Sequence, residues 1–600
     1  MKETDEKLGY TRHSLAHLLA AAVLEIWPDA KTTIGPAIDN GFYYDFEFAE
    51  PISDKDLPKI ENKMREILKT WDSFSHKEVS EKEAKEFFKN NSYKQELVDE
   101  IVKGTLGSST PKLTKSNLGV ELPSRITIYT SGNFSDLCRG GHVENPSKDI
   151  SKDAWKLERV AGAYWRGDEK NKMLTRIYGL AFNTKDELVR YIVQIEEAKK
   201  RDHKKLGKEL DLFTFSDLVG AGLPLWTPKG TILRDILDNF VWELRKKAGY
   251  ERVDIPHVTK KDLYEKSGHW QKFGEELFKI KTREGHELVM KPMNCPHHTQ
   301  IYARKPWSYR EMPQRYASTT KVYRDEQSGE LAGLSRVRAI TQDDAHVFCR
   351  QSQVKEEMAK IWDIIEVFYS AVGFTLTPRL SLHDPKHMEN YLGNEETWKK
   401  AEDELRALAK EKGAKAPEAL GEAAFYGPKI DFLGKDSLGR EWQLATIQLD
   451  MNMPERFDLD CTNEKGERER IVMIHAAIMG AIERYLSIII EHFAGAFPLW
   501  LAPVQVKVIP IGEAHYKAAE SAATALSAAG LRTDLDISDE GFGKKVRHAK
   551  QMKIPYFIII GDKDIAEKKV TLESRDKGNL GQLTIEDVVE KLSKETTKKI

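Results

Sequence analysis

The chain has few cysteines and no long apolar run. Four cysteines among 600 residues are too few for a disulfide framework. No segment approaches the roughly 18 consecutive apolar residues of a membrane-spanning helix. The charged N-terminus, MKETDEKLGYTRHS, lacks the apolar core of a signal peptide. These absences argue against a secreted disulfide scaffold and a membrane protein, and they predict a protein of the reducing cytoplasm.

The chain also lacks an excess of charge and the two common nucleotide-binding loops. Its 93 basic and 95 acidic residues leave a net charge of −2, so contact with nucleic acid must use local basic patches. Neither GxxxxGK[ST] nor GxGxxG occurs. A length of 600 residues predicts three or four domains.

Helix and strand patterns are mixed in the first part of the chain. Apolar residues recur at helical spacing over 11–27 and stop at Pro28, and 40–48 alternate like a strand after an Asn-Gly turn. Residues 185–210 read as one long charged helix between domains. Its basic residues form either a solvated face or a contact for a phosphate backbone, and they are Lys199, Lys200, Arg201, Lys204, Lys205 and Lys208.

The middle of the chain predicts a largely antiparallel sheet. An amphipathic helix over 231–250 is followed by a strand over 251–258 that contains Pro256. Further strand patterns are separated by turns or by one helix, at 286–293, 320–326, 335–341, 424–434 and 440–450. The last hundred residues instead alternate strand and helix, which predicts a small α/β domain with a mixed sheet.

Three potential metal ligands lie far apart in the sequence, each in an apolar segment that predicts burial. They are Cys295, His346 and His475. One thiolate and two imidazoles are a ligand set for a zinc ion with an open fourth position. Taken singly, a buried cysteine is usually a small hydrophobe and a buried histidine a core residue, so the pattern alone leaves both interpretations open.

Arginines are interleaved with these ligands. Arg324, Arg336 and Arg338 lie in a strand–loop–strand pattern with glycines in the loop, and Arg484 follows Gly480. Guanidinium groups bind phosphate bidentately, so the arrangement suits a triphosphate, with surface salt bridges as the alternative. Metal-ligand and phosphate-binding residues in one domain predict an enzyme that activates a substrate with ATP.

The N-terminal part holds a second candidate cluster. His13 and His17 are one helical turn apart, and Cys138 and His142 have the same spacing. HxxxH with CxxxH is a strong pattern for a four-ligand zinc site. One hypothesis is therefore a zinc hydrolase with this cluster as its only active centre. The arginines of the central domain argue against it, because hydrolysis needs no triphosphate clamp.

Several long motifs, in the right order, resemble threonyl-tRNA synthetases, a family of class II aminoacyl-tRNA synthetases. The helix and strand ending at Pro256, the segment Tyr323–Arg338, and GAIERY around Arg484 resemble the three class II motifs. KPMNC, TQDDAH, FYGPKID and MIH resemble the threonyl family in particular. HSLAH, GPAIDNGFYYD, DLCRGGHV and GAYWRGD resemble its editing domain, so the resemblance covers nearly the whole chain.

The resemblance implies a multidomain α+β protein. We expect an editing domain at 1–180, a connector helix at 181–210, a class II catalytic domain at 211–500 and an α/β anticodon-binding domain at 501–600. The implied activity is ATP-dependent formation of threonyl-adenylate from L-threonine, transfer to tRNA(Thr), and hydrolysis of mischarged Ser-tRNA(Thr). The long motif 1 helix implies a homodimer, and neither DNA nor a membrane is expected as a partner. Many bacterial members begin with a ubiquitin-like (TGS) domain, whereas this sequence opens almost directly on the editing domain.

The resemblance assigns roles in the synthetic site. One Zn²⁺ would be held by Cys295, His346 and His475, and Mg²⁺ would accompany ATP. Threonine would be bound by Met293, Gln342, Asp344, Tyr426 and Gln448. ATP would be bound by Arg324, Glu326, Arg336 and Arg484, with Arg324 also clamping the threonine carboxylate. His269 would be the general base toward the tRNA ribose, and Lys429 would face the developing negative charge.

In the same family the N-terminal cluster is read as a metal-free hydrolytic pocket, which we favour over a second zinc. Its members are His13, His17, Lys94, Asp136, Cys138 and His142. The anticodon would meet Glu540, Lys545 and Arg547. Departures from the family pattern are His297 for Gly, Ala476 for Arg, Ile340 for an adenine-stacking Phe and Pro510 for an anticodon-reading Asn. A synthetase-like regulator that binds tRNA without charging it is the remaining alternative, although such a protein should have lost arginines or ligands that are present here.

Overall fold

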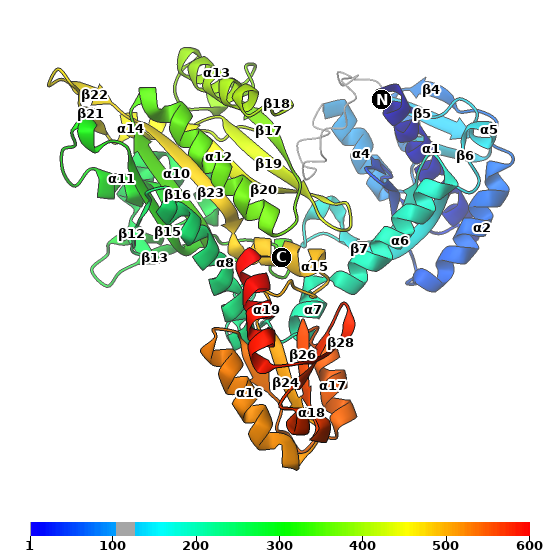
Figure 1. Cartoon of the computed structure of the whole chain (residues 1–600). Helices are drawn as coiled ribbons and strands as arrows, with labels where there is room; N and C mark the ends of the chain where they lie inside the picture. Colours follow the sequence, from blue (N-terminus) through cyan, green and yellow to red (C-terminus); the bar gives the residue numbers. More distant parts are fainter. Residues whose placement is uncertain (1, 104–125, 600) are drawn as a thin grey trace. The chain divides into compact units, whose positions relative to one another are not determined.

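The computed structural model describes residues 2–103 and 126–599, which form two compact units (Figure 1). The first unit spans Met1–Glu196 and the second Glu197–Ile600. Among the described residues, no helix is long and apolar enough to cross a membrane. The boundaries that we predicted for four segments of the chain stay predictions.

The first unit is built around one long helix and a curved antiparallel sheet. Helix α1 (Lys2–Ile26) ends two residues before Pro28, as its apolar pattern predicts. The expected hairpin is formed by β2 (Ala37–Ile38) and β3 (Gly41–Glu47). The sheet continues in the order β1-β3-β8-β7, with β1 (Lys31–Thr32), β7 (Trp155–Tyr164) and β8 (Met173–Ala181). The core lies between α1, α2 (Leu57–Leu68) and this sheet.

A second, smaller sheet completes the first unit. It consists of β4 (Ser75–Val79), β5 (Ile126–Ser131) and β6 (Phe134–Leu137) in the order β4-β5-β6. Helices α3 (Glu81–Phe87) and α4 (Ser92–Lys103) lie against β5, and α5 (Pro146–Asp149) follows β6 in the chain.

The prediction of one continuous helix over 185–210 is wrong. Helix α6 (Lys185–Arg201) ends at Asp202, whose ψ of 120° leaves the helical region, and α7 (His203–Glu209) starts anew. The Asp202 carboxylate accepts a hydrogen bond from the Lys204 N–H at 2.8 Å, as an N-cap residue does. A local cap on a short polar side chain thus overrides a continuous helical charge pattern.

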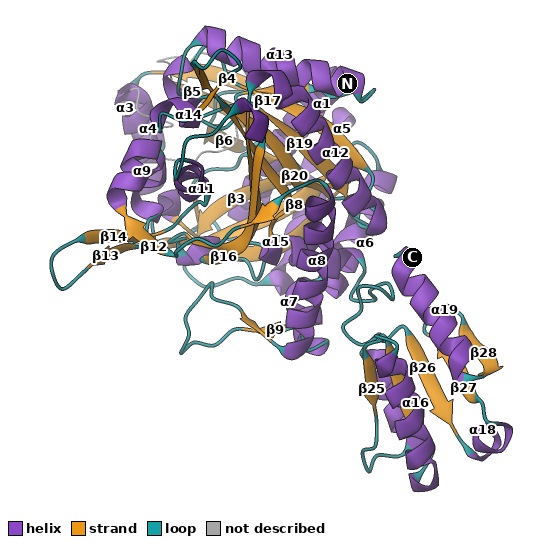
Figure 2. Cartoon of the chain, turned by 60° about the vertical axis from the view of Figure 1, so that its left-hand side comes forward, coloured by secondary structure: helices purple, strands orange, loops and turns teal. Residues whose placement is uncertain are grey.

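The second unit contains an eight-stranded sheet in the order β11-β15-β16-β23-β20-β19-β17-β18. All neighbours in it are antiparallel except the two edge pairs, which confirms the predicted antiparallel sheet. The central strands are β15 (Gln314–Tyr323), β16 (Ala339–Cys349), β17 (Leu376–Leu382), β19 (Lys429–Lys435), β20 (Glu441–Asp450) and β23 (Val472–Ala481). Helices α8 (Pro228–Lys247), α12 (Val354–Ala371) and α15 (Ile482–His492) pack into its main core (Figure 2).

Two expected strands of this unit have different bounds. The segment 251–258 is not one strand, because proline has no N–H for a sheet ladder. Instead β11 (Glu251–Arg252) joins the large sheet, and β12 (Val258–Lys260) joins a separate sheet with β13 (Lys279–Lys281) and β14 (Glu287–Met290). Strand β16 begins only at Ala339, so Arg336 and Arg338 lie in the preceding loop rather than on the strand.

The remaining elements of this part surround the large sheet. They are β9 (Phe213–Thr214), β10 (Leu225–Trp226), β18 (Glu418–Leu420), β21 (Asp460–Thr462), β22 (Arg468–Arg470), α9 (Lys261–Ser267), α10 (His269–Phe273), α11 (Cys295–Tyr302), α13 (Glu395–Glu411) and α14 (Asn452–Arg456). Helix α11 contributes to a separate small core together with residues of β15, β16 and β23.

The C-terminal part has the predicted mixed sheet, in the order β25-β24-β26-β27-β28. Strands β24 (Val506–Pro510), β25 (Thr533–Leu535) and β26 (Tyr556–Ile560) are parallel, and β27 (Val570–Ser574) and β28 (Gly578–Leu583) are antiparallel. Helices α16 (Tyr516–Ala528) and α19 (Ile585–Lys598) cover one face, and α17 (Phe542–Gln551) covers the other. The pattern did not reveal β28 or the short α18 (Asp562–Glu567).

Candidate functional site

The structure brings the three predicted metal ligands together. Their ligand atoms all lie within 4.8 Å of one another, and His346 Nε2 is 3.1 Å from His475 Nδ1. His346 on β16 is the direct cross-strand partner of His475 on β23, so both side chains lie on one face of the sheet. Cys295 is the first residue of α11, where backbone N–H groups favour a thiolate.

This cluster fits a zinc ion. Two nitrogen ligands at about 2.0–2.1 Å on a tetrahedral zinc lie about 3.3 Å apart, close to the spacing of the two imidazoles. The far ring nitrogens are held by neighbours: His475 Nε2 lies 3.0 Å from Asp450 Oδ2, and His346 Nδ1 lies 2.8 Å from His298 Nδ1. Such outer partners orient metal-binding imidazoles and leave the facing nitrogens available.

Burial governs the charge of these groups. It lowers the pKa of His346 far below its usual range, so the imidazole is neutral, the form that binds a metal. It raises the pKa of the Cys295 thiol, and the carboxylates of Asp344 and Asp450 add to the effect. A bound cation would supply the positive charge that a thiolate needs at this position.

The residues predicted to bind threonine surround the metal cluster. Asp344 sits at a β-bulge of β16, where bulges commonly redirect a side chain, and accepts a hydrogen bond from Asn294 Nδ2 at 3.1 Å. Its Oδ1 lies 3.7 Å from His346 Nε2. Burial raises the pKa of Asp344 to about 6. Tyr426 donates a hydrogen bond to Gln448 Oε1 at 2.8 Å, and Asn294 Nδ2 lies 3.5 Å from Gln342 Oε1.

Arg324 follows β15 and points toward the same pocket. Its Nη2 lies 3.2 Å from Met293 Sδ, and its guanidinium lies 4.8 Å from the ring centre of Phe273. Its Nε is buried and has no hydrogen-bond partner among the described residues. Since a buried guanidinium is costly without an anionic partner, this arrangement favours an anionic ligand.

Glu326 and Arg336, two residues predicted to contact ATP, form an ion pair with each other. Arg336 Nε donates to Glu326 Oε2 at 2.8 Å, and Arg336 Nη2 lies 3.2 Å from Glu330. Arg338, in the same loop, donates to the Glu326 carbonyl. Arg484, on α15, lies 5.9 Å from the ring centre of Trp442. The loop and α15 therefore present basic groups at one end of the sheet.

Lys429 belongs to a buried network centred on Asp431. Lys429 is the cross-strand partner of Gln448, which in turn is the partner of His475, so a single row of residues crosses the sheet. Lys429 Nζ lies 3.0 Å from Asp431 Oδ2. The fully buried Asp431 also accepts hydrogen bonds from Ser381 Oγ at 2.7 Å and from Gln443 Nε2 at 2.6 Å. The carboxylate therefore fixes the position of the lysine.

His269 lies beside the cysteine of the metal cluster. Its Nε2 is 3.6 Å from Cys295 Sγ, and its Nδ1 is 2.9 Å from Ser267 Oγ. Burial lowers the pKa of His269 to about 3. The imidazole is therefore neutral.

The second cluster also forms, within the first unit. The ligand atoms of His13, His17, Cys138 and His142 lie within 4.8 Å of one another. Cys138 Sγ is 3.2 Å from His142 Nε2 and 3.6 Å from His13 Nε2. Burial raises the pKa of Cys138 to about 12 and lowers that of His142 to about 2, so the thiol and imidazole are neutral.

Lys94 and Asp136 form a buried ion pair next to this cluster. Tyr44 donates to Asp136 Oδ2 at 2.5 Å and accepts a hydrogen bond from Lys94 Nζ at 3.1 Å. The same Oδ2 lies 4.0 Å from His17 Nδ1, which has no hydrogen-bond partner among the described residues. The pocket thus holds a fixed acid–base pair beside neutral imidazoles.

The three predicted anticodon residues differ in exposure. Arg547, on α17, is exposed, and so is Glu540, which pairs with Lys544. Lys545 is buried, and its Nζ donates to the Asp536 carbonyl at 3.1 Å. Lys545 therefore positions the turn that precedes α17, and Arg547 is the better placed of the two basic residues to meet RNA.

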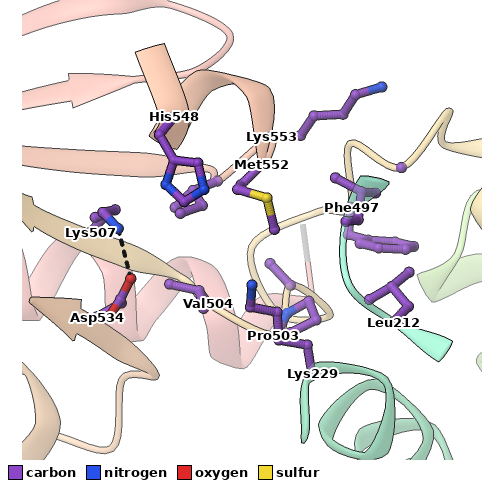
Figure 3. A pocket seen from close by; sticks show the side chains of 14 residues that line it. Leu212, Lys229, Phe497, Pro503, Val504, Lys507, Asp534, His548, Met552 and Lys553 are labelled. Carbon is purple, nitrogen blue, oxygen red and sulfur yellow. Dashed lines mark hydrogen bonds and ion pairs between the residues drawn. The ribbon is translucent and has the colours of Figure 1, made fainter. Parts of the chain in front are cut away.

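A small pocket that opens to solvent lies near the inner side of α17 (Figure 3). Lys229, His548 and Met552 line it, and Lys507 pairs with Asp534 at 2.9 Å at its edge. None of the residues predicted for the three sites lines this pocket, and we assign it no role.

Several residues of these sites were not found from the sequence. Asp450 and His298 hold the metal-cluster imidazoles, Asp431 holds Lys429, and Tyr44 holds Asp136. Three had a local signal: Asp450 follows Gln448 and Asp431 follows Lys429 at strand spacing, and His298 lies three residues after Cys295 on a helix. Tyr44 had none, because its partner Asp136 is 92 positions away in the chain.

Three family models match this chain. The tRNA synthetase class II core domain (G, H, P, S and T) matches residues 278–493, and the anticodon-binding domain matches 505–595. The second additional domain of threonyl and alanyl tRNA synthetases matches 126–178. Together with the antiparallel sheet and the clustered basic residues, these matches define a class II aminoacyl-tRNA synthetase.

Individual relatives narrow the class. A threonine–tRNA ligase of Cytophaga hutchinsonii is 45% identical over 594 residues, covering 98% of this chain and 88% of the relative. One of Gloeobacter violaceus is 44% identical over 612 residues, covering 99% and 94%. A crystal structure described as the RNA binding domain of the threonyl-tRNA synthetase of Cryptosporidium parvum Iowa II has a TM-score of 0.63 at 36% identity, covering 66% of this chain and 98% of that one. The chain belongs to the threonine–tRNA ligase family.

Family membership confirms the predicted fold class, the ligase activity and the presence of an editing domain. The family reaction uses an amino acid, ATP with Mg²⁺, and tRNA. The roles predicted for single residues stay predictions and are developed as proposals below.

Proposed function

We propose that this chain activates L-threonine with ATP at a zinc centre held by Cys295, His346 and His475, transfers the threonyl group to tRNA(Thr), and hydrolyses Ser-tRNA(Thr) at the cluster of the first unit. The observation that carries the proposal is the convergence of one thiol and two imidazoles, from three distant segments, within 4.8 Å. A buried set of this composition has few uses other than metal binding.

Selection of threonine rests on a polar pocket. A zinc ion held by Cys295, His346 and His475 would supply a Lewis acid for the amino and hydroxyl groups of threonine, whereas valine has no hydroxyl to offer. Shape alone discriminates such isosteres by only about 1–3 kcal/mol. Asp344 would accept hydrogen bonds from the same amino and hydroxyl groups, and Asn294 holds the carboxylate in place. Gln342, Tyr426, Gln448 and Met293 would close the pocket.

Adenylate formation rests on the basic residues. Arg324 would bridge the threonine carboxylate and the α-phosphate, which would give its buried Nε an acceptor. Arg336 and Arg484 would bind the outer phosphates with Mg²⁺, and Glu326 would contact adenine. ATP binding would therefore exchange the Glu326–Arg336 pair for contacts with the nucleotide. Lys429, held by Asp431, would stabilise negative charge as the α-phosphate is attacked.

Transfer to tRNA needs a proton acceptor near the ribose. Neutral His269 would take the proton of the attacking hydroxyl, because its ring lies at the edge of the threonine pocket. The anticodon would be read by the C-terminal part, with Glu540 and Arg547 in contact and Lys545 supporting their turn.

Serine retains the hydroxyl and is smaller than threonine, so the zinc pocket does not reject it well and a second, hydrolytic site is needed. We propose that this site acts without a metal. Lys94 and Asp136 would orient the ester and the attacking water, and His13, His17, Cys138 and His142 would bind the terminal adenosine and serine. The ion pair beside the imidazoles supports this proposal, because it supplies charge without a metal.

We also propose that the chain forms a homodimer, because an exposed apolar segment could be covered by a second copy. Between β9 and β10 the side chains of Leu218, Val219 and Phe215 are exposed, Leu218 almost completely at 99%. An apolar group of this kind is typical of a surface covered by a partner. We expect the chain to sediment as a dimer, and Leu218→Lys to shift it toward monomer. A monomeric parent chain would contradict the proposal.

The function is tested by threonine-dependent ATP–pyrophosphate exchange. We expect strong exchange with threonine, weaker exchange with serine and very little with valine, followed by charging of tRNA(Thr). A chain that binds tRNA(Thr) without exchange would instead be a regulator. Hydrolysis of Ser-tRNA(Thr) without exchange would leave only the first-unit pocket active.

A further inference from the structure

A buried histidine connects the joint between α6 and α7 to both elements that carry ATP-binding arginines. His203, the first residue of α7, is 5% exposed. Its Nδ1 lies 2.6 Å from Glu491 Oε1, and its Nε2 accepts the Leu334 N–H at 3.0 Å. Leu334 belongs to the loop before β16 that carries Arg336, and Glu491 belongs to α15, which carries Arg484.

The hydrogen bonds define one protonation state of His203. Because Nε2 accepts a hydrogen bond, the proton of the neutral ring is on Nδ1, which donates to the Glu491 carboxylate. The backbone N–H of His203 donates to the same carboxylate at 3.1 Å. Arg440 Nη2, 2.7 Å from the other oxygen, completes the pairing of Glu491. Asp202, His203 and Glu491 lie close enough together to hold a metal ion. Both ring nitrogens of His203 are already hydrogen-bonded, however, so neither is free to bind one.

The loop approaches His203 more closely than most residues would permit. Gly333 has a φ of 55°, and a Cβ there would lie 2.4 Å from His203 Nε2 and 2.8 Å from Lys204 Cγ. The next residue, Leu334, is fully buried, and Ser335 Oγ lies 3.0 Å from Ser487 Oγ on α15. The loop is therefore packed closely against α7 and α15, through Gly333, Leu334 and Ser335.

We propose that His203 is a positioning residue for ATP: through Leu334 and Glu491 it holds the Arg336 loop in register with the Arg484 helix. The inference rests on the proposed function, since it assumes that these arginines bind the nucleotide. If His203 is replaced by a residue without an acceptor, the buried Leu334 N–H has no hydrogen-bond partner. The loop that carries Arg336 is then no longer held against α7. Affinity for ATP then falls, while the threonine pocket and the metal ligands, on other elements, are untouched.

The test measures threonine-dependent ATP–pyrophosphate exchange by the full chain, with the KM for ATP and for threonine determined separately. For His203→Ala we expect the KM for ATP to rise about tenfold, the size set by one unpaired buried amide, with the KM for threonine and the zinc content unchanged. His203→Gln can still offer an acceptor oxygen to Leu334, and it should recover most of the affinity. His286→Gln, on an exposed residue of the β13–β14 hairpin, is the matched control.

Gly333→Ala disturbs the same contact from the loop side and serves if His203→Ala does not fold. It should also raise the KM for ATP selectively. A KM for ATP within twofold of the parent in the folded variants would overturn the proposal. An equal rise in the KM for ATP and for threonine would also overturn it, because it would indicate general damage. Absence of threonine-dependent exchange in the parent chain would instead count against the proposed function itself.

Discussion

His346 Nε2 and His475 Nδ1 face each other at 3.1 Å although 129 positions separate them in the chain. Strand pairing alone accounts for this approach, because the two residues are direct cross-strand partners. The same row continues through Gln448 to Lys429, so residues proposed for metal binding, threonine recognition and charge stabilisation share one face of one sheet.

Removal of one metal ligand tests the zinc centre. In Cys295→Ala we expect the chain to lose about one zinc ion and all threonine activation while it remains folded, because two imidazoles bind zinc far more weakly than the full set. Zinc is measured by elemental analysis and activation by pyrophosphate exchange. Cys349→Ala, a buried cysteine of the same sheet, is the control. Full activity in a zinc-free variant would rule out the centre.

The buried guanidinium of Arg324 should be indispensable for adenylate formation. Arg324→Lys keeps the charge but loses the fork that bridges carboxylate and phosphate. We expect kcat/KM for activation to fall by at least about 2.7 kcal/mol in transition-state free energy. Single-turnover adenylate formation is the measurement, with Arg310→Lys on the surface as control. A variant within threefold of the parent would contradict this role.

Asp431 should act on catalysis through Lys429. Lys429→Met is expected to slow activation about a hundredfold, on the scale of losing one electrostatic donor. Asp431→Asn should cause a comparable loss, since the lysine and its neighbours lose their shared acceptor. If the carboxylate works by positioning the lysine, the double variant will be little slower than either single variant. Fully additive losses would mean that Asp431 has a separate role.

The two active sites should be separable. His13→Ala with His17→Ala is expected to leave threonylation intact and abolish deacylation of preformed Ser-tRNA(Thr), because both histidines lie in the first unit. The exposed pair His286→Ala with His387→Ala is the matched double control. Equal deacylation by all three proteins would remove the cluster from the editing reaction.

Metal analysis of the same proteins decides how the editing pocket works. We expect the Cys295→Ala chain to contain no stoichiometric zinc, because the proposed pocket acts through Lys94 and Asp136. About one zinc per chain in that variant, lost again on His13→Ala with His17→Ala, would make His13, His17, Cys138 and His142 ligands instead.

The sequence determined the elements and the ligand types of this protein. The apolar period of 11–27 and its stop at Pro28 specify α1, and the strand patterns separated by turns specify the antiparallel sheet, because these signals act between near neighbours in the chain. The family motifs were enough to predict Cys295, His346 and His475 as metal ligands, and the structure brings their ligand atoms within 4.8 Å of one another. Chain-local signals failed where a single cap or proline competed with a longer pattern, at Asp202 and Pro256.

Only the tertiary structure decided which side chains support the reactive ones. Asp450 behind His475, Tyr44 beside Asp136, and His203 against Leu334 are contacts between segments that no local pattern links. The bulge that places Asp344 depends on how β16 registers with β23, and strand register is a property of the assembled sheet. Burial also depends on the tertiary structure, because elements distant in the chain exclude water from these side chains. Burial lowers the pKa of His269 to about 3 and leaves Nε of Arg324 without a hydrogen-bond partner among the described residues.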